Sequence, residues 1–164
     1  MSREHLFSTR VRWTGEQEPD PRDPLAPEPG AGGVSRYTRD MLVEPPGKPA
    51  IVGSSSRAFK GDDGRYNPED LMLASLGECH VLTYLALAGK EKIRLVSLEV
   101  DVNGVLALVD GKMRFREATI VARTRVGNAA DIERASALHD GAHADCFMSN
   151  SVNFPIAVQR SVST

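Results

Sequence analysis

Two cysteines lie in polar surroundings that suit thiol chemistry. Cys79 lies inside the apolar stretch NPEDLMLASLGECHVLTYLALAGK, residues 67–90, with a glutamate before it and a histidine after it. Cys146 lies in a second polar stretch, HDGAHADCFMSNS. A single cysteine on a buried helix usually behaves as a small apolar residue. The polar neighbours and the second cysteine favour a reactive thiol here.

Three arginines upstream could activate such a thiol. They are Arg36, Arg39 and Arg57. A guanidinium near a cysteine lowers the pKa of the thiol and favours the thiolate, which is the nucleophilic form. For each of the three, the alternative is a solvated arginine on the face of a strand.

Histidines offer a different chemistry. His139 and His143 are spaced i and i+4 on one helical face, which suits a zinc or nickel site. Gly141 weakens the helix that would present them, and structural zinc sites usually have closer cysteine pairs. We keep a metal-binding protein as the alternative from a different class. Its ligands would be Cys79, His80, His139, His143 and Cys146.

The histidine at position 80 follows Cys79 directly, which suggests a Cys-His nucleophile pair. Adjacent residues on a helix diverge by ~100°, however, and do not face each other. We therefore expect His80 to be a hydrogen-bonded structural histidine.

Residues 67–90 are predicted to form one long helix. Asn67 suits the N-cap, Pro68 suits the first helical position, and the two following acids favour the positive end of the helix dipole. Gly89 suits the C-cap. Apolar residues cover nearly the whole circumference, so we predict a helix that is buried on all sides.

The other periodic segments predict strands and a second helix. Strands are expected at 6–13, 36–43, 50–56, 93–109, 112–126 and 152–160, and a helix from 128 to 141–144. Asp110-Gly111 should join two of the strands as a hairpin, with a bend or bulge at Asn103-Gly104. Pro155 places the last strand at an edge or bulge. The order indicates an α+β fold with a mainly antiparallel sheet.

The whole chain reads as one ordinary domain. Its 164 residues suffice for a single core over residues 1–164. Residues 16–33 hold five prolines, three glycines and five acids, which indicates a surface loop. A net charge of −2 shows no basic excess for nucleic acid or an anionic membrane. We expect no signal sequence and no membrane span, which would need ~18 apolar residues. We therefore expect a cytoplasmic location. In the reducing cytoplasm, two cysteines 67 positions apart are expected to stay free thiols.

Several motifs together resemble one family. They are WTG at Trp13–Gly15, AFKGD at 58–62, NPEDLMLASLGECH at 67–80 and LHDGAHADCFMSNSVNFPIAV at 138–158. In these stretches the chain resembles the OsmC/Ohr superfamily of thiol peroxidases over nearly its whole length. The Pro-rich loop at 16–33 departs from the family, whose members usually have a short turn there.

The resemblance implies reduction of organic hydroperoxides by two cysteines. Cys79 matches the peroxidatic position and Cys146 the resolving position, so a Cys79–Cys146 disulfide would form and a dithiol, such as a lipoyl group on a carrier protein, would reduce it. Glu69 matches the glutamate that holds a catalytic arginine over the thiolate. Arg39 is the first choice for that arginine, ahead of Arg36 and Arg57. The resemblance implies no metal, flavin or haem.

The resemblance also raises a problem of distance. Glu69 and Cys79 are ten residues apart, which is ~15 Å along one α-helix. An intertwined homodimer, in which this helix packs antiparallel on its copy near Ala74, would bring Glu69 of one chain to Cys79 of the other. A third hypothesis keeps that dimer as a non-catalytic binder of apolar ligands. Apolar residues expected to wall the thiols and favour organic peroxides are Met72, Leu76, Leu82, Tyr84, Phe147 and Met148.

Overall fold

The structure, a computed structural model, describes residues 4–15 and 37–164. Its contacts divide the chain into two compact units, Met1–Leu71 and Met72–Thr164. The loop expected at 16–33 and Arg36 lie outside the described residues. The expectation of one domain over residues 1–164 stays a prediction.

The first unit contains a small antiparallel sheet. Its strands are β1 (Arg10–Trp13), β2 (Met41–Glu44) and β3 (Ile51–Gly53), in the order β1-β2-β3. All three were expected, but each is shorter than its periodic segment. Two prolines follow β2 directly, and because proline has no backbone N–H to donate, they end the ladder there. A short 3₁₀ helix at Arg57–Phe59 follows β3.

Helix α1 (Pro68–Lys90) begins as its sequence predicts. The Asn67 side chain accepts a hydrogen bond of 2.8 Å from the backbone N–H of Asp70. The Asp70 carboxylate accepts one of 3.2 Å from the backbone N–H of Asn67. This reciprocal pair satisfies two backbone donors that have no partner inside the helix.

The end of α1 differs from its prediction. Gly89 lies inside the helix, and Lys92 is the residue that adopts left-handed φ, at 56°. The N–H of Ile93 then donates to the carbonyl of Ala88, and the N–H of Lys92 to that of Gly89, which is a Schellman ending. Ile93 is buried at 6% exposure and packs with Ala88 in the core. Burial of Ile93 therefore fixes the left-handed residue at Lys92, three positions beyond the expected cap.

One stripe of α1 is buried, not its whole circumference. Leu76, His80, Tyr84 and Ala88 follow an i, i+4 spacing and are 0–1% exposed. On other sides of the same helix, three large apolar residues are 40–60% exposed: Met72, Leu82 and Leu85. The prediction of burial on all sides is thus wrong for a single chain.

The second unit contains a three-stranded sheet with the order β4-β5-β6. Strands β4 (Leu95–Val109) and β5 (Lys112–Val126) form the expected hairpin. Asp110 and Gly111 form its turn with φ of 51° and 75°, the conformation that a two-residue type I′ turn requires. One of the two register shifts falls between Val105 and Leu106, so this bulge lies just beyond the position expected for it, and the other falls between Leu95 and Ser97.

Gly104 has a packing role instead. A Cβ added there would lie 2.6 Å from the ring of Phe115 and 2.8 Å from the side chain of Leu73 on α1. The glycine therefore lets α1 and Phe115 approach the strand closely.

Strand β6 (Ile156–Ser163) pairs in parallel with β5 and lies at the edge of the sheet, with Pro155 just before it. The connection between them carries a 3₁₀ turn (Ala129–Asp131), helix α2 (Ile132–Asp145) and a second 3₁₀ turn (Ser149–Ser151). Asn128 caps the first turn as expected, accepting from the N–H of Ala130 at 3.0 Å. Helix α2 continues through Gly141, slightly beyond its expected end.

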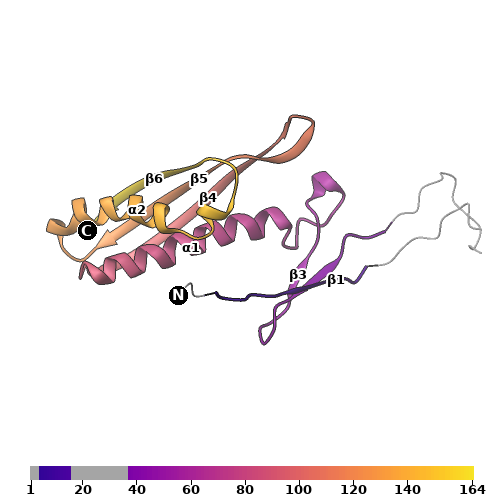
Figure 1. The fold of residues 1–164 in the computed structure, drawn as a ribbon, viewed down its shortest axis with the longest axis horizontal. Helices are drawn as coiled ribbons and strands as arrows, with labels where there is room; N and C mark the ends of the chain where they lie inside the picture. The colour runs from indigo at the N-terminus through magenta and orange to yellow at the C-terminus, as the bar shows by residue number, and fades with distance from the viewer. Residues whose placement is uncertain (1–3, 16–36) are drawn as a thin grey trace, which may run out of the picture. The chain divides into compact units, whose positions relative to one another are not determined.

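Helices α1 and α2 pack on the same face of this sheet (Figure 1). A Cβ added at Gly77 of α1 would lie 3.0 Å from Val102 of β4. On α2, His139 contacts Thr124 of β5, which faces the same side as Val102. The buried core residues between the layers are Tyr84, Ala88, Ile93, Val126, Ala135 and Ala142. The α+β class with a mainly antiparallel sheet is confirmed.

The length and composition of α1 also meet the criterion for a membrane span. The sequence-based expectation that no segment does so is wrong for residues 68–90. The core helix of a soluble domain meets the same criterion, and the packing of one stripe of α1 on the sheet accounts for part of its apolar character.

Candidate functional site

The structure brings the two cysteines together, although 67 positions separate them in the sequence. Cys79 is half-buried on α1, Cys146 is fully buried just after α2, and both are free thiols. The backbone N–H of Met148 donates to the sulfur of Cys79 at 3.5 Å. The N–H of Ser149 donates to the sulfur of Cys146 at 3.3 Å. The turn after Cys146 thus supplies a backbone donor to each thiol.

The two thiols differ in accessibility. Burial raises the pKa of Cys146, and its hydrogen bond with Cys79 raises that pKa further. Cys146 therefore stays a thiol over a wide pH range, whereas Cys79 is the sulfur within reach of a molecule from solution. The arrangement suits a pair in which Cys79 reacts first and Cys146 second.

The apolar wall expected around the thiols is only partly present. Leu76 and Tyr84 are fully buried in the core, so they cannot contact a substrate and that expectation is wrong for them. Phe147 is 81% exposed, and Met148 is half-buried with its N–H on Cys79. Of the expected wall, Met148 is the residue with a recorded contact to a thiol, through its backbone N–H on Cys79.

A buried polar network lies beside the thiols. Nε2 of His80 and Nδ1 of His139 are 3.1 Å apart, and Nε2 of His139 is 3.0 Å from Oγ1 of Thr124. The prediction that His80 is a hydrogen-bonded structural histidine is confirmed. Thr124 was missed by the sequence reasoning. The sequence feature that could have revealed Thr124 is a single hydroxyl residue among the alternating apolar residues of β5, which are Ala118, Ile120, Ala122 and Val126.

Both histidines of this network favour the neutral form. Burial is the main cause that lowers the pKa of His139, to about 4, and the neighbouring His80 and Arg160 lower it further. Burial also lowers the pKa of His80, with His143 adding to the effect. Protonation of either ring would place a charge in an apolar core.

Acid is expected to destabilise the protein through His139. The unfolded chain binds a proton near pH 6.5, while the folded chain resists it down to about 4, so the stabilisation is complete above pH 6.5 and is lost as pH falls. Between about pH 7.5 and about pH 5 this histidine alone should lower the free energy of unfolding by about 2 kcal/mol. Urea unfolding of the wild type and of His139→Gln at both pH values measures it. Equal losses in the two proteins would contradict this assignment.

The metal-binding alternative depends on ligands that face one point. His80 and His139 use their facing nitrogens on each other. Within residues 4–15 and 37–164, no three His, Cys, Asp or Glu side chains are placed to hold one ion. In this part of the chain the metal hypothesis therefore has no cluster to support it.

Within one chain, Glu69 is not brought to the Cys79 thiol, and the two described candidate arginines have other partners. Helix α1 is uninterrupted from Glu69 to Cys79, so the two residues lie ~15 Å apart along its axis. Arg39 stacks on the ring of Tyr37, with its guanidinium carbon 5.0 Å from the ring centroid. Arg57 pairs with Asp63 at 3.2 Å and is largely exposed. Among the described residues, no arginine forms an ion pair with Glu69.

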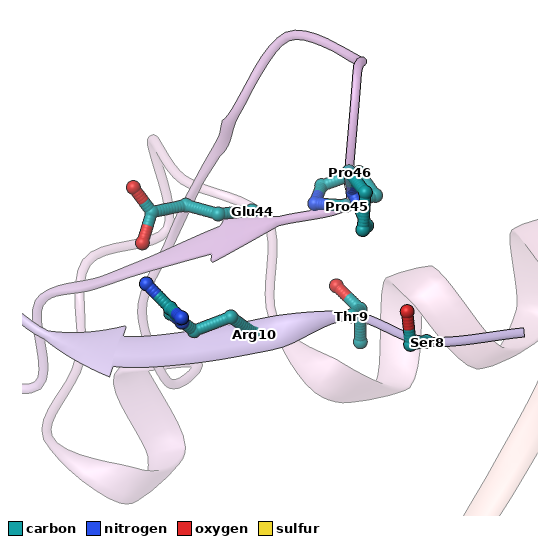
Figure 2. Close-up of a pocket in the computed structure, with 6 residues that line it drawn as sticks. All are labelled: Ser8, Thr9, Arg10, Glu44, Pro45 and Pro46. Carbon is teal, nitrogen blue, oxygen red and sulfur yellow. The ribbon is translucent and has the colours of Figure 1, made fainter.

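The first unit has a shallow surface hollow of about 490 Å³ (Figure 2). It lies between the start of β1 and the end of β2, and its walls contain Arg10 and Glu44. The carboxylate of Glu44 pairs with Arg12 at 3.3 Å. The lining of the hollow contains no thiol and no histidine. Its lining residues are Ser8, Thr9, Arg10, Glu44, Pro45 and Pro46.

The fold and the paired thiols define a class of α+β protein with known relatives. A family model described as OsmC-like protein matches residues 61–160. An OsmC-like protein of unknown function from Vibrio cholerae O1 biovar eltor is similar in structure, at 21% identity and a TM-score of 0.78, over 96% of this chain and 100% of that one. The chain belongs to the OsmC-like protein family, and the family prediction is confirmed.

Other solved structures share the fold. An organic hydroperoxide resistance protein from Elizabethkingia anophelis is 20% identical with a TM-score of 0.68, over 100% of this chain and 99% of that one. The organic hydroperoxide resistance protein OhrB of Bacillus subtilis is 20% identical with a TM-score of 0.60, over 96% and 99%. A comparison with curated proteins found no match.

Proposed function

We propose that this protein is a thiol peroxidase that reduces organic hydroperoxides to alcohols in defence against oxidative stress. The observation that carries the proposal is the meeting of two free thiols, one accessible and one buried, from distant parts of the sequence. Membership in the OsmC-like family and structural likeness to proteins named for organic hydroperoxide resistance support it.

The reaction would proceed in two balanced steps. The Cys79 thiolate attacks the terminal peroxide oxygen, the O–O bond breaks, and the alkoxide takes a proton and leaves as an alcohol. Cys79 is then a sulfenic acid. Cys146 attacks its sulfur, the S–S bond forms, the S–O bond breaks, and hydroxide leaves with the proton of Cys146 as water. Two thiols are oxidised for each peroxide reduced.

A dithiol would restore the two thiols by exchange, releasing its own disulfide. The family resemblance points to a dithiol such as a lipoyl group on a carrier protein. The proposed location is the cytoplasm, where such reductants keep cysteines reduced.

A homodimer would complete the site. The apolar residues Met72, Leu82 and Leu85 on α1 are 40–60% exposed, which is unusual for so long an apolar helix. Antiparallel packing of α1 on its copy near Ala74 would cover them and bring Glu69 of one protomer level with Cys79 of the other. The small, exposed side chain of Ala74 would allow the two backbones to approach, whereas Gly77 packs on Val102 of its own sheet.

An arginine held by Glu69 would then stabilise the Cys79 thiolate. Arg39 is our first choice because Arg57 is already paired with Asp63 on an exposed segment. Pairing is also what makes Glu69 tolerable at an interface, since an unpaired carboxylate removed from water is costly.

Counting thiols after peroxide treatment tests the proposal. Reduced protein treated with cumene hydroperoxide should lose two thiols per chain, and hydrogen peroxide should react clearly more slowly. The preference follows from apolar contacts of the organic group with residues such as Phe147, since each buried methylene contributes about 0.8 kcal/mol. Stopped-flow thiol titration with both peroxides measures the two rates.

Two results would contradict the proposal in different ways. Equal rates with both peroxides would remove the substrate assignment. No thiol loss with either peroxide would favour a non-catalytic binder of apolar ligands. Elemental analysis of protein purified without chelator is the matched control, because a stoichiometric metal would support the metal-binding alternative instead.

A further inference from the structure

The buried network of His80, His139 and Thr124 joins three separate elements. His80 belongs to α1, His139 to α2 and Thr124 to β5, and each residue is 0–2% exposed. The two imidazole rings are parallel within 5°, with centroids 5.4 Å apart. The ring of Tyr84 stacks on His139 at 4.2 Å, and its hydroxyl donates to the carbonyl of Ala135 on α2 at 3.0 Å. Side chains of α1 thus hold α2 at two positions.

The unpaired atoms determine the direction of the hydrogen bonds. A neutral imidazole has one donor and one acceptor nitrogen. Nδ1 of His80 is buried and has no partner among the described residues. If His139 donated to His80, that Nδ1 would carry a buried N–H without an acceptor, which is the costlier arrangement. The bonds therefore run from His80 Nε2–H to His139, and from His139 Nε2–H to the hydroxyl of Thr124.

The network lies close to both thiols along the chain. His80 follows Cys79 directly on α1, and His139 precedes Cys146 by seven residues, about two turns of α2. The hydrogen bond between the histidines therefore links the two helices that carry the thiols. A change in the position of α2 relative to α1 would change the distance between the two sulfurs.

We propose that His80, His139 and Thr124 are positioning residues that set the geometry of the Cys79–Cys146 pair and thereby control closure of the disulfide. The inference rests on the proposed function for its biological role, whereas the effect of the network on formation of the disulfide can be measured without peroxide. A disulfide tolerates only a narrow geometry, with Cβ atoms ~3.5–4.5 Å apart, so small shifts between helices matter. Of the two thiols, only Cys79 takes part in the first attack on a peroxide. The network should therefore affect the second step and leave the first unchanged.

The closure step itself needs no group beyond those present in the proposed reaction. Cys146 gives up its proton, and its sulfur attacks the sulfenic sulfur of Cys79. One S–S bond forms as one S–O bond breaks, and the hydroxide leaves as water with that proton. The network takes no proton in this step and acts only through position.

The first experiment avoids peroxide. Wild type and variants are equilibrated with reduced and oxidised dithiothreitol, and the fraction of Cys79–Cys146 disulfide gives the effective concentration of the thiol pair. Thr124→Val should lower it about tenfold, as loss of one ordinary buried hydrogen bond allows. Thr124→Ser keeps the hydroxyl and should stay within about twofold of wild type. Thr119→Val is the matched control, on the same strand and the opposite face of the sheet.

The second experiment uses cumene hydroperoxide under single turnover. Loss of the first thiol should proceed at the wild-type rate in Thr124→Val, while disulfide appears more slowly and more Cys79 is over-oxidised to sulfinic acid. Mass spectrometry of quenched samples separates these species. His139→Asn, whose shorter side chain cannot reach both partners, serves as a second variant should Thr124→Val not fold.

The outcomes separate the inference from the proposed function. Equal disulfide equilibria and equal over-oxidation in Thr124→Val and Thr119→Val would overturn the positioning role, as would a wild type that forms no Cys79–Cys146 disulfide in dithiothreitol. A wild type that forms this disulfide but loses no thiol to either peroxide would instead overturn the peroxidase proposal. In that case the dithiothreitol comparison still decides the positioning role.

Discussion

Replacing Cys79 by serine is expected to abolish hydroperoxide reduction, to the level of a protein-free control. Cys79 is the accessible thiol of the pair, and no other sulfur of the site is exposed to attack. A serine hydroxyl has nearly the same size but is not a thiolate, so the fold is kept while the nucleophile is lost. Turnover with cumene hydroperoxide and an excess of dithiol measures the effect, and an unchanged melting temperature is the control.

The companion variant Cys146→Ser separates the two roles. It should still consume one equivalent of peroxide, then stop as a sulfenic acid and over-oxidise, since the resolving thiol is absent. A dimedone adduct on Cys79 identifies the stalled state. Catalysis by Cys79→Ser together with inactivity of Cys146→Ser would mean that the buried thiol attacks first.

Mixing two inactive variants is expected to restore activity. Glu69→Ala lacks the carboxylate and Cys79→Ser lacks the nucleophile, so each homodimer should be inactive. If the site is shared between protomers, a mixed dimer combines Glu69 of one chain with Cys79 of the other. Random pairing gives half mixed dimers with one working site each, or about a quarter of wild-type activity. Unfolding the two proteins together, refolding them and assaying turnover measures it.

The control for this experiment is a double variant. Glu69→Ala mixed with Glu69→Ala/Cys79→Ser should stay inactive, because no pairing restores a site. No recovery in the first mixture, with mixed dimers shown to form by mass spectrometry, would place Glu69 in the site of its own chain or outside any site. The helix makes the own-chain arrangement difficult, because it holds the two residues ~15 Å apart.

Features set by neighbouring residues were predictable from the sequence. The capping pair of Asn67 and Asp70 involves residues three positions apart, and the turn at Asp110-Gly111 needs only two residues that tolerate positive φ. The Asn67 cap and the turn therefore matched their predictions, whereas the reciprocal bond to Asp70 was found only in the structure. The end of α1 did not, because it depends on the burial of Ile93 in a core built from other elements. Gly89 offered a good local cap that the tertiary structure does not use.

Features that depend on which element packs or pairs against a segment were not predictable from the residues of that segment alone. The alternation in β6 indicated a strand but carried no information on direction, and its parallel pairing was unexpected. Apolar residues around α1 indicated burial without showing which surface covers them. The pairing of the two cysteines came from resemblance to a family, because their spacing alone left a metal site open as an alternative. Thr124 entered the network only through contact with His139.

The long separation in sequence between segments that meet in the structure, such as β5 and β6, has a consequence during protein synthesis. Paired residues such as Ala118 and Ile156 are 38 positions apart, and contacts of such long range form late in folding. At ~5–20 residues per second, a ribosome needs roughly 3–13 s to add the 67 residues between Cys79 and Cys146. During that interval the nascent chain has the first thiol without the second. On the proposed chemistry, a peroxide that reaches the nascent chain in this interval would over-oxidise Cys79, because the resolving thiol is still absent.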